Sequence, residues 1–217
     1  MIQKGQLTTT RERLLKEAEI LFAEKGYDAV SVREITKAAN CNLAAVNYHF
    51  GNKENLYLEV FRSRWVPRAR RLQEHVKKSL TGQSHFSADA MVKAIALAFL
   101  EGSLSEDEQL RHYQLITREM AHPTDAFELV AEEVMRPAFK ELADVLRLVI
   151  PGDVSEERLM LNILSIFGMV LYFNFARAAV TRITGHQYDQ AFKDRLVEHI
   201  ADFSLTGLGI DKKEKSL

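Results

Sequence analysis

The chain has 217 residues, of which 47% are hydrophobic, and its formal net charge is −1. A chain of this length can form one or two domains with a sizeable core, and its near-neutral charge excludes a uniformly basic protein that coats nucleic acid. Its single cysteine excludes an internal disulfide and suits a reducing cytoplasm.

The charge is unevenly distributed along the chain. Residues 1–75 contain 13 Lys and Arg against 9 Asp and Glu, whereas the remainder contains 16 against 21. A mildly basic end on an acidic body is consistent with DNA binding at that end. The first ten residues lack an apolar stretch, so we expect no secretory signal and a cytoplasmic location.

The first predicted element is an amphipathic helix. Thr9 and Glu12 fit a capping box at its start, and Gly26 ends it. Ser105 and Glu108 give the same signal ahead of a later helix. We expect the first helix to brace the segment that follows it.

The next feature is a pair of short helices joined by a tight turn. Ser31 and Glu34 fit a further capping box, and apolar residues follow at helical spacing. Asn40 tolerates the left-handed backbone of a helix exit, and Asn42 is a good N-cap for a second helix over 43–50. This is the helix-turn-helix pattern, whose second helix can enter a DNA major groove.

Helical patterns fill the rest of the chain, and no strand pattern occurs, so the predicted fold class is all-α with about nine helices. Pro67 and Pro137 fall inside two of the helices, where kinks are expected. A polar loop covers residues 81–87, and the ends, Met1–Leu7 and the tail from Asp211, are expected to be loose. The later helices are predicted over residues 52–80, 88–100, 106–121, 125–150, 155–183 and 188–205.

The helix over 155–183 would be about 43 Å long. Its stretch Leu159–Ala176 has no charged residue, and 14 of its 18 residues are apolar. That length is borderline for a membrane span, and a soluble helix that is covered on two sides gives the same signal. We favour the soluble interpretation, in which a second copy of the chain covers one side.

Several short motifs together resemble the N-terminal domain of TetR-family transcriptional regulators. The resemblance covers roughly Thr9 to Val60, although Asn40, Cys41 and Asn42 differ from the commonest residues of the family's turn. It implies a helix-turn-helix DNA-binding domain over 1–52 and a helical ligand-binding and dimerisation domain over 53–217. The motifs are Gly26–Tyr27, Ser31–Ile35, Ala38–Ala39, Tyr48–Phe50 and Lys53–Glu54–Leu56.

The resemblance also implies how the chain would contact a DNA operator. The helix over 43–50 would enter the major groove, where Asn47 can offer a bidentate pair to adenine and Ala44 can touch a thymine methyl group. The residues expected near base edges are Asn42, Leu43, Ala44 and Asn47. Those expected to grip phosphates are Ser31, Arg33, Tyr48, His49 and Lys53.

In the family, the last two helices pair two subunits, and the helices before them enclose a ligand. Applied to this chain, the resemblance implies a homodimer through 155–183 and 188–205, a near-palindromic operator and a small, largely apolar effector. The stretch Arg118–Thr124 further resembles the C-terminal domain of CerR-type members. Candidate ligand contacts, which are also ordinary core residues by type, are Trp65, Phe99, Tyr113, Ile116, Met120, Phe139, Phe167 and Tyr172.

Other functions remain open at the level of sequence. Scattered histidines, one cysteine and the absence of a Gly-rich loop argue against an enzyme, a metal site or a cofactor. A helical protein-interaction module, or a redox-sensing regulator that uses Cys41 without a small-molecule inducer, are the alternatives to a ligand-responsive regulator. The sequence does not distinguish a repressor from an activator. We choose repressor because most members of the family that it resembles repress transcription.

Overall fold

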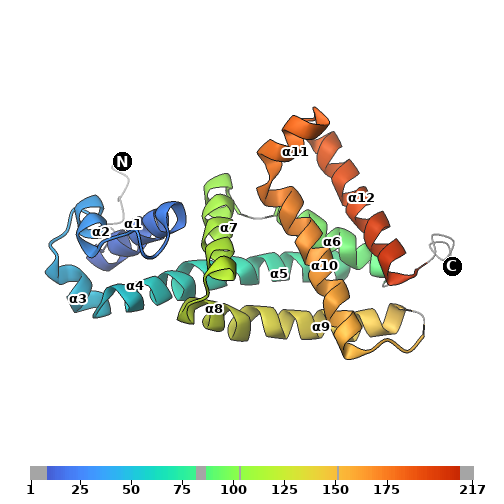
Figure 1. Cartoon of the computed structure of the whole chain (residues 1–217), viewed down its shortest axis with the longest axis horizontal. Helices are drawn as coiled ribbons and strands as arrows, with labels where there is room; N and C mark the ends of the chain where they lie inside the picture. Colours follow the sequence, from blue (N-terminus) through green and yellow to red (C-terminus); the bar gives the residue numbers. More distant parts are fainter. Residues whose placement is uncertain (1–8, 82–86, 103, 151, 211–217) are drawn as a thin grey trace, which may run out of the picture. The chain divides into compact units, whose positions relative to one another are not determined.

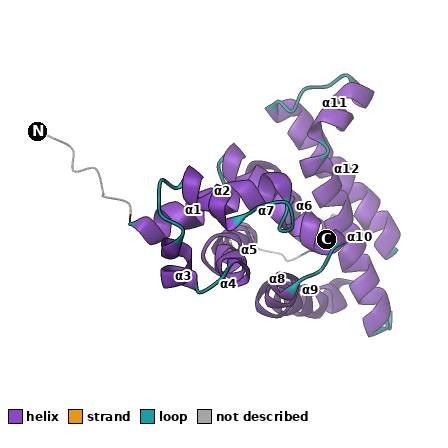
Figure 2. Cartoon of the chain, turned by 60° about the vertical axis from the view of Figure 1, so that its left-hand side comes forward, coloured by secondary structure: helices purple, strands orange, loops and turns teal. Residues whose placement is uncertain are grey.

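A computed structural model describes residues 9–81, 87–102, 104–150 and 152–210. Every regular element in these ranges is helical (Figures 1 and 2), which confirms the all-α prediction. The predicted loose ends and residues 82–86 of the predicted loop lie outside the described ranges. The elements are α1 (Thr10–Lys25), α2 (Val32–Ala38), α3 (Ala44–Phe50), α4 (Lys53–Val60), η1 (Phe61–Trp65), α5 (Val66–Thr81), α6 (Ala88–Glu101), α7 (Glu106–Ala121), α8 (Asp125–Val130), η2 (Ala131–Met135), α9 (Arg136–Val149), α10 (Glu156–Phe175), α11 (Arg177–Thr184) and α12 (Gln190–Leu208).

Side-chain caps fix where the helices begin. At the Ser105 cap of α7 both halves of the capping box form. The hydroxyls of Thr9 and Ser31 likewise accept backbone N–H groups at the starts of α1 and α2, and the carboxylates of Glu12 and Glu34 pair with Arg64 and Lys25. Each cap is worth about 1 kcal/mol.

The two internal prolines are accommodated by π-helical turns. η1 occupies the five residues that end two positions before Pro67, and η2 stands in the same register before Pro137. Proline lacks the N–H for an i−4 bond, and its ring clashes with that carbonyl, so a wider turn before it relieves the conflict. The predicted kinks are therefore π-turns within continuous helical stretches.

One predicted element is wrong in its extent. The single helix expected over 155–183 is two helices, α10 and α11, which meet at Ala176. At the junction the Asn174 side-chain amide donates to the Phe99 carbonyl, and Arg177 donates both to the Asn174 carbonyl (3.1 Å) and to its Oδ1 (2.9 Å). Counted as continuous stretches, with η1 and η2 joined to their neighbours, the described residues form ten helices, where about nine were expected.

Packing divides the chain into two compact units, which do not follow the order of the sequence. The head unit comprises the described residues of 1–69 and 104–133, and the body unit comprises those of 70–103 and 134–217. α7 and α8 therefore pack with α1–α4 rather than with the later helices. The predicted functional boundary between 52 and 53 concerns DNA contact and stays a prediction.

In the head unit, α1 packs against α2, α3, α4 and α7. Its buried face includes Leu14, Ala18 and Phe22, which are fully buried, as is Ile35 of α2. In the body unit, α6 packs along α12, and α10 contacts α6, α9 and α12. The core there is built from aliphatic side chains such as Leu159 and Ile163 of α10, so each unit has its own hydrophobic interior.

Candidate DNA-binding surface and effector helices

The predicted reading helix presents one buried and one exposed face. Val46 and Phe50 of α3 are buried against the head unit, at 0% and 9% exposure. Asn47 is exposed, as are Leu43 and Ala44. The helix begins at Ala44, one residue later than predicted, and presents short side chains to solvent at its N-terminal end. Such a surface can approach base edges closely.

The turn before this helix has the predicted geometry. Asn40 has a φ of 49°, the one positive φ among described non-glycine residues. The side-chain oxygen of Asn42 accepts the Ala45 N–H at 3.0 Å, so Asn42 caps the helix although its own side chain is otherwise exposed. The Cys41 thiol is half-buried and donates to the Ala39 carbonyl at 3.2 Å.

The predicted phosphate contacts surround α3. Ser31 and Arg33 are exposed at the start of α2, and the Tyr48 ring is 85% exposed. His49 is half-buried, with its ring 4.9 Å from that of Tyr48. The Lys53 ammonium lies 4.2 Å from the centre of the Tyr27 ring, so a cation–π contact holds it at the start of α4.

Two cations near this surface were not predicted. The Arg13 guanidinium is 3.6 Å from the Cys41 sulfur, which brings α1 to the turn between α2 and α3. Arg11 lies over the Phe50 ring at 5.3 Å and pairs with Glu59 at 2.5 Å. These contacts join helices that are distant in sequence, so helical periodicity alone gave no signal for them.

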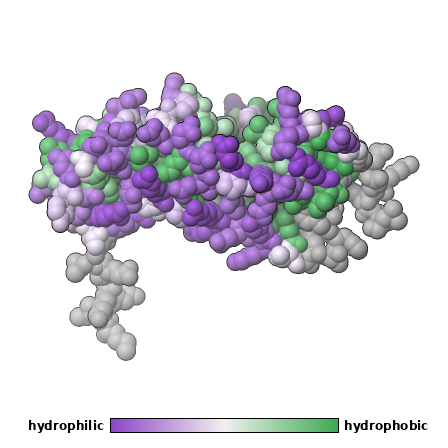
Figure 3. Space-filling model, turned by 90° about the horizontal axis from the view of Figure 1, so that it is seen from below, coloured by the Kyte–Doolittle hydropathy of each residue, from purple (hydrophilic) through white to green (hydrophobic). Residues whose placement is uncertain are grey.

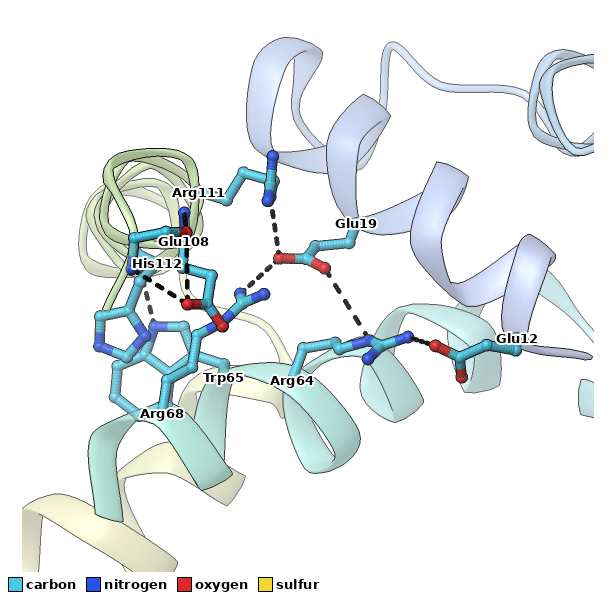
Figure 4. Close-up of polar contacts among 9 residues, drawn as sticks. Glu12, Glu19, Arg64, Trp65, Arg68, Glu108, Arg111 and His112 are labelled. Carbon is cyan, nitrogen blue, oxygen red and sulfur yellow. Dashed lines mark hydrogen bonds and ion pairs between the residues drawn. The ribbon is translucent and has the colours of Figure 1, made fainter. Parts of the chain in front are cut away.

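A buried network of charges ties α1 to α5 and α7 (Figure 4). Glu19 of α1 is 4% exposed, and its carboxylate accepts from Arg68 and, at 3.2 Å, from Arg111. Arg68 is 6% exposed and also reaches Glu108 at 3.4 Å. Buried charges of this kind destabilise the fold unless they are paired, so removing one partner would leave another buried charge unpaired.

A second buried contact ties α4 to α7. The Tyr57 hydroxyl donates to Glu119 at 2.6 Å, and Glu119 is 1% exposed. Burial, followed by this hydrogen bond to a carboxylate, raises the pKa of the Tyr57 phenol far above its usual value. The ring of Tyr57 packs at 4.9 Å from Phe22 and from Tyr27, at the centre of the aromatic core of the head unit.

Four of the predicted ligand contacts lie in the head unit. Trp65 is 5% exposed, its indole N–H donates to the His112 carbonyl at 2.9 Å, and its ring stacks on that of His112 at 4.4 Å. Tyr113 and Ile116 are buried, whereas Met120 is 54% exposed. Trp65 therefore already uses its single donor within the protein.

The other four lie in the body unit, where three of them touch. The Phe167 ring is 5.9 Å from that of Phe99 and 5.1 Å from that of Phe139, and all three are half-buried. Tyr172 is 46% exposed and turns to the outside of α10, against Phe173 and Phe175. Of the predicted ligand contacts, Phe99, Phe139 and Phe167 therefore form the group that best matches the expected apolar lining of an effector site.

A surface hollow of about 360 Å³ lies on α7. None of the predicted ligand residues lines it. The lining residues are Gln114, Thr117, Arg118, Ala121 and His122. Among the described residues, no group of three or more His, Cys, Asp or Glu side chains is placed to hold a metal ion.

The exposed side of α10 is apolar. Exposed fractions are 57% for Leu161, 49% for Leu164 and 56% for Phe175, and Gly168 has no neighbouring atom within 4 Å of an added Cβ. On α12, Phe203 is 63% exposed. Hydrophobic residues also gather over the right-hand part of the face drawn in Figure 3, which is formed by helices of the body unit.

α10 is long and apolar enough to cross a membrane by length and composition, which on its own is weak evidence. Only 28% of that apolar stretch is buried. Much of the helix therefore lacks a cover within its own chain.

Comparison with protein families gives two matches that together cover most of the chain. Residues 14–60 match the family model of bacterial regulatory proteins of the tetR family. Residues 88–208 match the C-terminal domain of the HTH-type transcriptional dual regulator CecR. The C-terminal type is thus correctly named CecR rather than CerR.

Individual relatives agree with these matches. The dual regulator CecR of Shigella flexneri is 28% identical over 191 residues, 85% of this chain and 83% of its own. The transcriptional repressor AcnR of Corynebacterium glutamicum is 40% identical over 55 residues, 25% of this chain and 29% of its own. The TetR-family regulator PfmR of Thermus thermophilus shares the fold, with a TM-score of 0.59 at 20% identity over 95% of this chain and 99% of its own.

These matches concern regulators of transcription and not enzymes. They span the reading head and the helices that follow it. The chain therefore belongs to the TetR family of transcriptional regulators, with a CecR-type C-terminal domain.

Proposed function

We propose that the protein is a homodimeric, ligand-responsive transcriptional repressor that binds a near-palindromic operator through α3. The observation that carries the proposal is the exposed face of α3, which presents Ala44, Asn47 and Tyr48, within the segment that matches the tetR family. Asn42, Leu43, Ala44 and Asn47 face base edges, and Ser31, Arg33, Tyr48, His49 and Lys53 hold phosphates.

Pairing of two chains is supported by the uncovered apolar side of α10. A soluble chain gains free energy by removing such side chains from water, at about 25 cal/mol per Å². A second copy offers the same surface, and a two-fold contact lets α10, α11 and α12 of both chains cover one another. This is the contact predicted through 155–183 and 188–205, expressed in the helices of the structure.

The effector site is the finer part of the proposal. Phe99, Phe139 and Phe167 touch within the body unit and would take a small, largely apolar molecule, whose binding releases the operator. Trp65, Tyr113, Ile116, Met120 and Tyr172 remain proposed contacts. The relative CecR is named a dual regulator, so repression by this chain is likewise a proposal. We place the protein in the cytoplasm, where its operator is.

Selection of bound DNA from a random pool tests the proposal. We expect a two-fold symmetric motif whose half-sites lie about one helical turn, or a multiple of it, apart. Binding should weaken steeply with salt, because phosphate contacts release counterions. A folded dimer that retains no DNA at low salt would contradict the proposal and favour the protein-interaction module instead.

A redox-sensing regulator is the second alternative. Its supporting observation is the position of the Cys41 sulfur, which is half-buried and lies 3.6 Å from the Arg13 guanidinium. The variant Cys41→Ser distinguishes redox sensing from response to a small molecule. If peroxide releases the wild-type chain from its operator but does not release the variant, redox sensing is favoured. If the variant responds to peroxide as the wild type does, redox sensing through Cys41 is excluded.

A further inference from the structure

Two adjacent residues at the C-terminal end of α7 support the reading head, by which we mean helices α1–α4 (Thr10–Val60). Arg118 donates from Nε to the Ala23 carbonyl at 3.1 Å and from Nη2 to the Glu24 carbonyl at 2.6 Å. The last carbonyls of a helix lack partners within it and attract cations, so Arg118 caps α1. A Cβ on Gly26 would lie 3.1 Å from the Arg118 Nη1, so glycine at this position allows the guanidinium to approach.

The next residue, Glu119, holds α4 and α8. It accepts hydrogen bonds from the Tyr57 hydroxyl at 2.6 Å and from the N–H and hydroxyl of Thr124, each at 2.9 Å. Its carboxylate is buried, and these donors compensate for the loss of water. One turn of α7 thereby fixes the end of α1, the middle of α4 and the start of α8.

Aromatic contacts carry this arrangement to the proposed DNA surface. Tyr57 packs on Tyr27 at 4.9 Å, and the Tyr27 ring supports the Lys53 ammonium at 4.2 Å. Tyr27 also follows Gly26, against which Arg118 lies. Both residues of α7 therefore act on the same support of a proposed phosphate contact.

We infer that Arg118 and Glu119 are positioning residues for DNA binding, although neither belongs to the proposed contact surface. They lie in the segment that matches the CecR C-terminal domain, so this domain helps to set how firmly the reading head is held. The inference rests on the proposed function, because it concerns DNA binding by the same head. It requires no effector to be bound.

A double-mutant cycle on DNA affinity tests the link from Glu119 to Lys53. Tyr57→Phe removes the hydroxyl that meets Glu119 and keeps the ring, so the packing of the core is preserved. We expect it to weaken operator binding at least about threefold. In a Lys53→Ala background the same substitution should lose most of its effect, because the group that it positions is gone. Effects that multiply independently would overturn the link.

A parallel comparison tests Arg118. A lysine keeps the positive charge but cannot make both carbonyl contacts, so Arg118→Lys should weaken binding about as much as Arg118→Gln, with an unchanged salt dependence. Wild-type affinity in Arg118→Lys together with a loss in Arg118→Gln would mean that the residue acts through charge alone, which contradicts positioning.

Thr117→Ala is the matched control for both comparisons. Within the described part of the chain, its hydroxyl bonds to two carbonyls of α7 itself, at 2.7 and 3.2 Å. We expect wild-type DNA affinity, and a loss equal to that of the other variants would overturn the inference. All variants are compared as full chains at a temperature where circular dichroism shows them folded. If the wild-type chain binds no DNA specifically, the proposed function fails as well, whereas wild-type binding with independent effects refutes the inference alone.

Discussion

Asn47 shows how much of the proposed specificity rests on single side chains. It is exposed one residue after the buried Val46, so its carboxamide points away from the head unit. A carboxamide can donate to and accept from the edge of adenine at the same time. No other exposed side chain of α3 offers that pair of groups at its free end.

Asn47→Ala should therefore weaken binding to the best operator by roughly 1–3 kcal/mol and relax the base preference at one position of each half-site. The change removes no packing, because the side chain is exposed, so the fold should be intact by circular dichroism. Selection from a random DNA pool measures both effects. An unchanged selected motif would remove Asn47 from the base contacts.

Tyr57 predicts how stability depends on alkaline pH. The pKa of its phenol is raised in the folded chain by burial and by the bond to Glu119, while in the unfolded chain it ionises near its ordinary value of about 10. Above that pH the unfolded chain binds fewer protons, so the free energy of unfolding should fall as the pH rises further.

Tyr57→Phe should flatten this decline, which urea unfolding between about pH 9 and 11 can measure. Tyr48→Phe is the control, since that ring is 85% exposed and a change there should leave the slope as it is. Equal slopes for Tyr57→Phe and the wild type would contradict the assignment.

At the scale of elements, α10 is the helix whose surroundings are least complete. Its inner side chains Leu159 and Ile163 are fully buried or nearly so, while Leu161 and Leu164 are about half exposed. A helix with apolar residues on both sides needs two covers, and the chain supplies one of them.

Leu164→Glu should break the proposed pairing. Two-fold symmetry brings the substituted side chain and its copy to the same interface, where an unpaired charge costs about 3 kcal/mol, or roughly a hundredfold in the dissociation constant. Analytical ultracentrifugation should then report single chains. Leu148→Glu is the matched control, because Leu148 is 83% exposed and belongs to α9, which is none of the three helices of the proposed pair. Dimers of undiminished strength in Leu164→Glu would place the interface elsewhere.

Elements were predictable where a local signal decides them. The caps at Thr9, Ser31 and Ser105 lie within the few residues that they join, and the left-handed Asn40 follows from its own residue type. The break at Ala176 was missed because it depends on Asn174 reaching a carbonyl of α6, 75 residues away. The spacing of apolar residues along a helix carries no information about a contact with a distant helix.

The same reasoning explains the candidate site. The exposed face of α3 follows from the pattern of apolar residues on one short helix, so sequence sufficed to predict it. The contacts of Arg13, Arg118 and Glu119 join elements that are far apart in the chain and could not be read from spacing. For the effector, aromatic side chains that could line a pocket look the same as those that fill a core.

At the scale of the whole molecule, the chain passes between its two compact units three times: in α5, between α6 and α7, and in η2. Two of these crossings lie beside a proline-linked π-turn: the units divide after Ala69, two residues beyond Pro67, and after Glu133, within η2. π-turns often occur at functional positions. Figure 1 follows this path, with α4 and α8 leading into long continuous helices.

The assignment of α7 and α8 to the head unit bears on chimaeric regulators. A foreign reading domain joined near residue 60 would arrive without the hydroxyl that Tyr57 donates to Glu119, unless it carried a tyrosine at that place. It would also need a first helix whose final carbonyls meet Arg118. Exchange of domains in this group should therefore succeed only when the donor sequence restores those two anchor points, or when α7 and α8 travel with it.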